Sequence, residues 1–173
     1  MSAFLPTMKA AGLDVNWLTL LVGMDGPGKH PPLLSLDDIA AYATEEIERS
    51  ADSAAAAGVL ASLDSGADEV RATMRRFAET QHANAEREVR KWTVILLKHA
   101  IRHLPSDPIY GLLALTEFWE QFDYPADSPH FVQGRGDSTL PGDYFTDENF
   151  RSVVQRHREW IASEVAALRL GSG

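Results

Sequence analysis

The chain has 173 residues, of which 45% are hydrophobic and 24% are charged, a balance typical of a globular protein with a buried core. It has no cysteine, which excludes disulfides, thiolate catalysis and cysteine-based zinc sites, and its net charge of −9 argues against binding of DNA or RNA. No apolar run approaches the ~20 residues that span a bilayer, and the N-terminus lacks a secretion signal. We therefore expect a soluble, cytoplasmic protein with no membrane contact.

Acidic and basic residues are segregated along the chain. Residues 1–70 hold 11 acidic and 3 basic residues, residues 71–104 hold 3 and 8, and residues 105–150 hold 9 and 1. Acid-rich segments on either side of a basic one steer a basic partner onto an acidic face, or they are simply solvated helix surfaces. Composition alone leaves both interpretations open.

The first half of the chain predicts mostly helices. The apolar run Trp17–Val22 is the one candidate for a short strand. Ser35, followed three residues later by Asp38, has the pattern of a helix N-cap and predicts a helix that begins there. The alanine-rich stretch Ala54–Leu63 predicts a second helix.

Helical spacing continues through the second half. Apolar residues recur every three or four positions from Asp68 to Leu104, which predicts one long helix or two that meet near His82. The last helix is expected to begin after Thr146 and to end near Arg169, with His157 as a packing residue on its apolar side. Another helix is expected from about Pro108 to Gln121, and its inward residues are predicted to be Ile109, Leu112, Leu113, Thr116 and Trp119.

These elements predict an all-α protein: a single compact domain of five to six helices over residues 1–170, followed by a tail or cloning scar at 171–173. One long irregular loop, Asp123–Phe145, interrupts the helical pattern. The loop is longer than most structureless connections, and such loops are often functional.

The irregular loop is acidic and aromatic, a combination found at protein interfaces, where rings supply buried area and carboxylates supply register and association rate. The alternative is that each ring simply holds the loop against the core. We take as candidate partner-binding residues Asp123, Tyr124, Asp127, Asp137, Asp143 and Tyr144.

Evidence for catalysis is thin. His99 and His103 lie four residues apart on one helix, so they are weak candidates for ligands of a divalent metal. The alternative, purely structural interpretation is that both are partly buried packing histidines with hydrogen-bond partners. No cofactor is expected, and no serine nucleophile elbow is present.

Five groups of residues, spread over about residues 14–168, resemble a bacterial family known only as a domain of unknown function, number twenty-two forty-seven. They are Trp17 with Gly23, Ser35-x-x-Asp38-Ile39-x-x-Tyr42-Ala43, Arg90-Lys91-Trp92, Phe122-Asp123-Tyr124-Pro125-x-Asp127, and Tyr144 with Glu148-Asn149. The chain departs from the family in its proline- and glycine-rich loop at Asp25–Pro32 and its alanine-rich stretch at Ala51–Ala61. The resemblance implies a small stand-alone protein of the kind found near polymorphic toxin genes, where such proteins are considered immunity factors; it lends no catalytic residues.

The leading hypothesis is therefore a non-enzymatic immunity protein, which binds and neutralises a cognate bacterial toxin domain in the cytoplasm, with an acidic surface as the contact. Two alternatives stay open. The first is a metal-dependent hydrolase that uses His99 and His103, and the second is a helical scaffold that associates with copies of itself.

Overall fold

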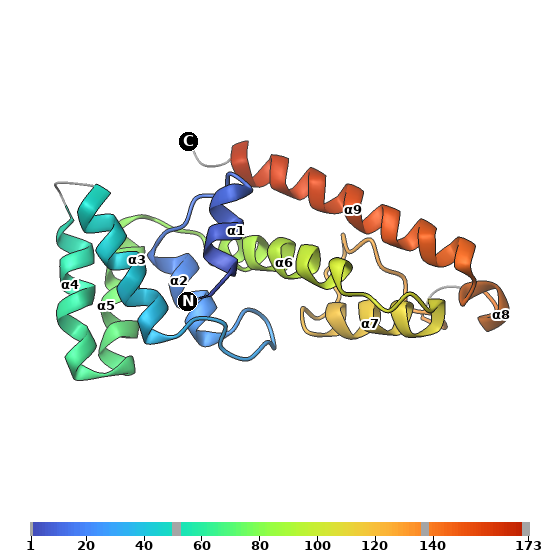
Figure 1. The fold of residues 1–173 in the computed structure, drawn as a ribbon, viewed down its shortest axis with the longest axis horizontal. Helices are drawn as coiled ribbons and strands as arrows, with labels where there is room; N and C mark the ends of the chain where they lie inside the picture. The colour runs from blue at the N-terminus through green and yellow to red at the C-terminus, as the bar shows by residue number, and fades with distance from the viewer. Residues whose placement is uncertain (1, 50–52, 136–138, 171–173) are drawn as a thin grey trace. The chain divides into compact units, whose positions relative to one another are not determined.

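A computed structural model describes residues 2–49, 53–135 and 139–170 (Figure 1). In these ranges the chain is an all-α domain with nine α-helices, one short 3-10 helix and no strand. The all-α prediction is confirmed, whereas the predicted number of five to six helices is too low. The prediction for the tail at 171–173 lies outside the described residues. None of the described helices is both long enough and apolar enough to cross a membrane.

Contacts between residues divide the chain into two compact units, Met1–Trp92 (unit 1) and Thr93–Gly173 (unit 2). Unit 1 holds α1 (Phe4–Ala10), α2 (Trp17–Asp25), α3 (Leu36–Arg49), α4 (Ala54–Ser62), the 3-10 helix η1 (Leu63–Ser65), α5 (Ala67–Thr80) and the first part of α6 (Ala85–Arg102). Unit 2 holds the rest of α6, α7 (Pro108–Glu120), α8 (Pro141–Tyr144) and α9 (Asp147–Leu170).

The run predicted as a strand is the helix α2. Asn16 accepts a hydrogen bond from the Thr19 backbone N–H at 2.9 Å and donates its own N–H to the Thr19 hydroxyl at 3.0 Å, which forms a capping box. Leu20 and Leu21 are both buried, so apolar residues on more than one side of the helix contact protein. The strand prediction was wrong because residues 17–22 are apolar except for Thr19, so the sequence shows no polar side from which a helical repeat can be recognised.

Helix α3 begins as predicted. The Ser35 hydroxyl accepts a hydrogen bond from the Asp38 N–H at 3.2 Å, and the Asp38 carboxylate accepts one from the Ser35 N–H at 3.0 Å. The buried face then carries Ile39 and Tyr42, and the Tyr42 hydroxyl donates to the Val15 carbonyl at 2.7 Å. This contact ties α3 to the segment that precedes α2.

A buried ionic network crosses the centre of unit 1. Lys91 is fully buried and donates to the Glu88 carboxylate at 2.8 Å and to the Asp14 carboxylate at 3.0 Å. Glu88, 1% exposed, also accepts hydrogen bonds from the Thr19 hydroxyl at 2.5 Å and the Asn16 amide at 3.0 Å. Lys91 and Glu88 each have a charged partner and further hydrogen bonds, which offset the free-energy cost of removing the two ions from water. The same bonds link α2 to α6.

Two helices, not one, cover residues 68–104. Helix α5 ends at Thr80 and α6 begins at Ala85, and between them His82 adopts a left-handed φ of 51°. The second of the two predicted possibilities is therefore the observed one.

Unit 2 is built on the packing of α7 against α9. Trp119 of α7 is fully buried and donates its indole N–H to Nε2 of His157 at 2.9 Å. Closer to the start of α7, a Cβ added at Gly111 would lie 2.5 Å from the Phe150 ring, so glycine is what allows α9 to approach there. The predicted helix start after Thr146 is confirmed, since the Thr146 hydroxyl accepts from the Asn149 N–H at 3.2 Å.

Candidate functional site

The irregular loop exists, although its end folds into the short helix α8. Three side-chain hydrogen bonds to backbone carbonyls hold it in place: Tyr124 hydroxyl to Thr116 at 3.1 Å, Trp160 indole to Asp127 at 3.0 Å, and Tyr144 hydroxyl to Phe131 at 2.7 Å. Aromatic rings therefore fasten this loop to unit 2, as the alternative interpretation of the sequence proposed.

The predicted partner-binding residues have different surroundings. Asp123, Asp127 and Asp143 are exposed, whereas Tyr124 is half-buried. Tyr144 is 5% exposed, so it supports the loop and offers a partner almost no surface. The prediction for Asp137 lies outside the described residues.

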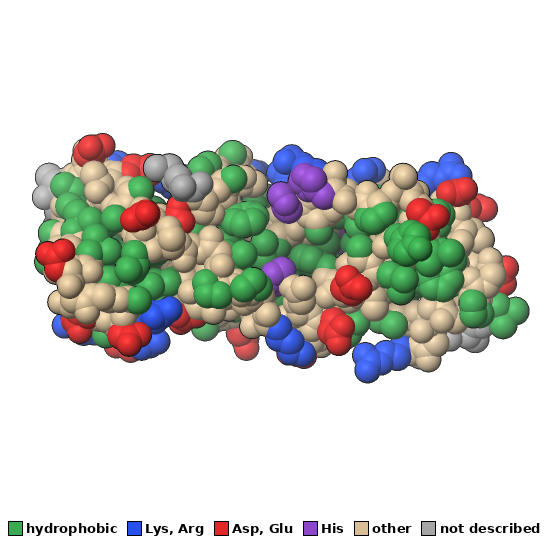
Figure 2. Space-filling model, turned by 60° about the horizontal axis from the view of Figure 1, so that its bottom comes forward, with side chains coloured by type: hydrophobic (Ala, Val, Ile, Leu, Met, Phe, Trp, Pro, Cys, Tyr) green, Lys and Arg blue, Asp and Glu red, His purple; other side chains and the backbone are tan. Residues whose placement is uncertain are grey.

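Helix α7 exposes three large apolar side chains on its outer side. Ile109, Tyr110 and Leu113 are 47%, 66% and 44% exposed, and hydrophobic side chains with acidic ones beside them gather over this helix in Figure 2. Ile109 and Leu113 were predicted to point inward, and that prediction is wrong: the buried side is formed by Leu112, Leu115, Phe118 and Trp119. Residues 108–115, in the first half of α7, carry apolar side chains or glycine throughout, so the sequence there did not show which side is buried.

Carboxylates flank these apolar side chains on α7. Glu117 and Glu120 are exposed in its C-terminal half, and Glu117 follows Leu113 by one helical turn. At the other end, Asp107 caps the helix through hydrogen bonds from the N–H groups of Ile109 and Tyr110, at 2.9 and 3.2 Å. We call the exposed side chains of Ile109, Tyr110, Leu113, Glu117 and Glu120 the α7 face. This combination of apolar and acidic groups resembles the anchor and rim of a protein interface.

Two buried histidines lie close together in unit 2: His130 belongs to the loop, and His157 to α9. His157 donates from Nδ1 to the Val153 carbonyl at 2.7 Å and accepts from Trp119 at Nε2, which fixes it as the neutral tautomer and confirms its predicted packing role. His130 contacts the Thr116 hydroxyl through Nε2 at 2.8 Å, and its ring centroid lies 5.5 Å from that of His157.

Burial sets the protonation of both histidines. Loss of hydration lowers the pKa of His157 to about 4, with the Val153 carbonyl opposing the shift. Burial is the main cause that lowers the pKa of His130 to about 3, and repulsion by a protonated His157 and by Arg156 adds to that shift. Both rings are therefore neutral at pH 7 and act as packing groups with hydrogen bonds.

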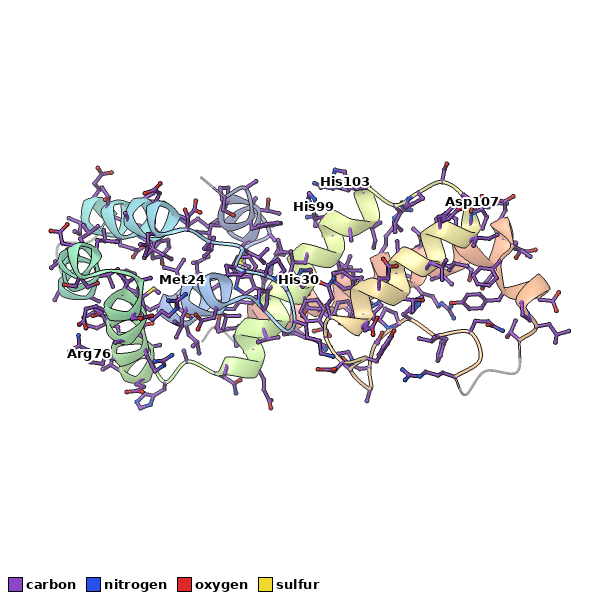
Figure 3. The ribbon with its side chains drawn as sticks, turned by 90° about the horizontal axis from the view of Figure 1, so that it is seen from below. Met24, His30, Arg76, His99, His103 and Asp107 are labelled. Atoms are coloured by element: carbon purple, nitrogen blue, oxygen red, sulfur yellow. The ribbon has the colours of Figure 1, made fainter. Side chains whose placement is uncertain are left out.

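The weak metal candidates are exposed. His99 and His103 extend from the same side of α6, with ring centroids 4.3 Å apart, and Nδ1 of His103 lies 2.8 Å from the His99 carbonyl oxygen (Figure 3). The expectation that they are partly buried packing residues is wrong, although His103 has the expected hydrogen-bond partner. Among residues 2–49, 53–135 and 139–170, no group of three or more His, Asp or Glu side chains is placed to hold a metal ion.

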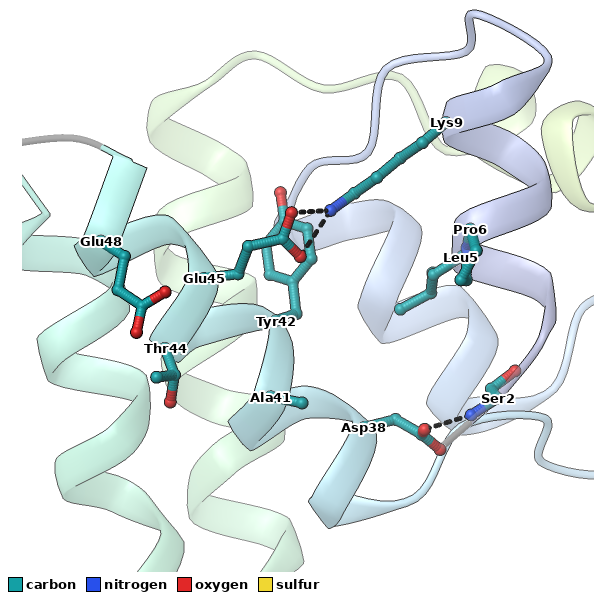
Figure 4. Close-up of a pocket in the computed structure, with 10 residues that line it drawn as sticks. All are labelled: Ser2, Leu5, Pro6, Lys9, Asp38, Ala41, Tyr42, Thr44, Glu45 and Glu48. Carbon is teal, nitrogen blue, oxygen red and sulfur yellow. Dashed lines mark hydrogen bonds and ion pairs between the residues drawn. The ribbon is translucent and has the colours of Figure 1, made fainter.

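Unit 1 has a groove of about 590 Å³ between α1 and α3 (Figure 4). Its floor includes Leu5 and Tyr42. Lys9 forms a bidentate ion pair with Glu45 across it, at 2.6 and 2.7 Å, and the Ser2 N–H donates to Asp38 at 2.5 Å. These bonds join the two helices that form the walls, so the groove is one consequence of how α1 docks on α3.

The chain belongs to the family DUF2247, described as an uncharacterized protein conserved in bacteria, whose model matches residues 5–165. No curated protein and no solved structure matches it. The residues that carried the resemblance are largely structural: Trp17, Tyr42, Lys91 and Trp92 are buried. They explain the fold of unit 1, and they assign no chemistry. The α7 face lies outside all these motifs; its only signal in the sequence is a helix with more apolar residues than one buried side needs.

Proposed function

We propose that this protein is a binding protein that neutralises a cognate bacterial toxin domain, and that the toxin docks on unit 2. The observation that carries the proposal is the α7 face, which places Ile109, Tyr110 and Leu113 in solvent on one helix. Neighbouring large apolar side chains that remain exposed on a monomer are typical of interaction sites.

Charge indicates what kind of partner fits. The exposed carboxylates of unit 2 include Glu117 and Glu120 on α7, and Asp123, Asp127 and Asp143 beyond its end. Residues 105–150 hold nine acidic residues and one basic residue. Such a segment attracts a basic surface and repels nucleic acid. A toxin domain that acts on nucleic acid carries a basic active site, so these carboxylates would occupy the positions of phosphates.

The first experiment is affinity capture of the tagged protein from a lysate of its host, at low and at high salt. A single stoichiometric partner that ends in a toxin-like domain and is released by salt is the expected result. Recovery of the protein alone, or only with further copies of itself, would contradict the proposal and favour a self-associating scaffold.

Binding kinetics with that partner then test the surface. Tyr110→Ala should speed dissociation of the complex. Tyr110 is the most exposed of the three large apolar side chains of the α7 face, and the variant removes the ring that the complex would bury. Asp127→Lys with Asp143→Lys should slow association and weaken its dependence on salt.

A matched control reverses two exposed acids of unit 1, Asp64→Lys with Glu79→Lys, which changes the net charge by the same amount. The unit 1 double variant should keep an association rate much closer to that of the wild-type protein than the unit 2 double variant does. Equal effects of both double variants would indicate that only net charge matters and would remove unit 2 as the docking surface.

A further inference from the structure

Unit 2 also carries a basic groove, at the end of α6 and along the first half of α9. Two adjoining cavities, of about 450 and 240 Å³, share Ile101 and Arg158 in their walls. Lys98 and Arg102 line one cavity, and Arg151 lines the other. Four cations thus line a single groove in a chain whose net charge is −9.

None of these four cations is neutralised by a carboxylate in the described part of the chain. The ion pairs of the described residues include those of other basic side chains, among them Lys9, Arg49, Arg71, Arg76, Arg87 and Lys91. Arg151 donates from Nε to the Asp147 carbonyl at 3.1 Å, which leaves its two terminal nitrogens for a ligand. The groove therefore presents four cations that form no ion pair with a described carboxylate.

Apolar side chains line both cavities, and we call them the apolar floor of the groove. Ile101 contributes from the end of α6, Leu104 from the segment after it, and Phe150, Val154 and Ile161 from α9. All five side chains are partly exposed. The α9 residues span eleven positions, or about 16 Å of helix.

One end of the groove is fixed by close backbone packing. Phe150 lies against Gly111, where a Cβ would also come within 3.0 Å of the Pro105 carbonyl oxygen. Pro105 and Phe150 therefore have little freedom, and the groove is a formed feature of unit 2.

We propose that this basic groove binds an acidic amphipathic helix of a partner protein. The cations alternate with apolar residues: Arg151, Val154, Arg158 and Ile161 follow one another at spacings of three and four along α9. A helix with acids beside an apolar stripe has the same repeat, so it would pair with both kinds of group at once. A nucleotide or a phosphate would use the cations and leave most of the apolar floor exposed.

Fluorescence anisotropy with a synthetic peptide tests the proposal on the full chain. The probe is a fluorescein-labelled helical peptide of about 18 residues with leucines at three- and four-residue spacing and glutamates beside them. Saturable binding that weakens as salt is added is expected. A peptide of identical composition, scrambled so that the leucines surround the helix, should bind at least about tenfold more weakly.

Variants locate the site. Arg158→Glu, which alters both cavities, should weaken binding about tenfold, whereas the matched control Arg75→Glu on α5 should leave the affinity within about twofold. Ile161→Ser should weaken binding without changing the salt dependence, because it removes only apolar contact. Circular dichroism checks that each variant is folded.

Three outcomes would overturn the proposal. The first is that the probe shows no saturable binding. The second is that Arg158→Glu and Arg75→Glu reduce the affinity for the probe equally. The third is that the scrambled peptide, or a short single-stranded DNA, binds as tightly as the probe and loses affinity equally in Arg158→Glu. That result would define a general polyanion surface. The proposal does not rest on the toxin hypothesis, which concerns the α7 face and the exposed acids.

Discussion

Acid should destabilise unit 2 through its two buried histidines. His130 and His157 are 6% and 0% exposed, and their pKa values fall from 6.5 in the unfolded chain to about 3 and about 4 in the folded one. Between these values and 6.5 the unfolded chain binds more protons, so stability falls as the pH drops through that window. Proton linkage predicts that the free energy of unfolding falls by about 2 kcal/mol for each histidine between about pH 7 and about pH 5.

Urea unfolding at both pH values, followed by circular dichroism and by tryptophan fluorescence, measures this loss; Trp119 and Trp160, two of the four tryptophans, lie close to the histidines. The double variant His130→Gln with His157→Gln should be less stable at pH 7, since it loses buried hydrogen bonds, yet its stability should change much less with pH. What remains of the slope should come from His30, whose pKa burial also lowers.

The control variant His103→Gln removes a histidine at an exposed position just after the end of α6. The reasoning would be refuted if the wild-type protein were equally stable at both pH values. It would also be refuted if the double variant lost as much stability on acidification as the wild type.

Three further changes test the packing described above. Lys91→Ala should cost roughly 3–5 kcal/mol in urea unfolding, because Glu88 would stay buried without its cation, and Lys91→Ala combined with Glu88→Ala should cost less than the sum of the two single changes. Gly111→Ala should lower the thermal midpoint measured by circular dichroism, since its Cβ overlaps the Phe150 ring; an unchanged midpoint would show that the ring moves freely. Ser35→Ala removes one half of a capping box and should cost about 1 kcal/mol, and Ser35→Thr should recover most of it.

Several features followed from local sequence alone. The capping pattern at Ser35 placed the start of α3, and the hydroxyl of Thr146 placed the start of α9. Pro108 marked the first residue of α7. Each of these signals is local, because a cap or a proline acts on the backbone within one turn.

Other features depended on long-range packing. The run Trp17–Val22 begins at a local capping box, but its apolar side chains are covered by partners distant in the sequence, such as Phe77 against Trp17. Lys91 is buried with Asp14, 77 positions away, bonded to its ammonium group. No local pattern marks a lysine for burial.

The candidate surfaces divide in the same way. The sequence by itself determined an acidic protein with an acidic, aromatic loop, because charge and ring content do not depend on the fold. Only the tertiary structure decided that Tyr144 is a support for the loop, that Tyr110 and Leu113 face solvent, and that Arg151 and Arg158 line a groove with Lys98. The reason is that the exposure of a side chain depends on which other residues pack against it, and the sequence of a single helix does not show which elements will pack against it.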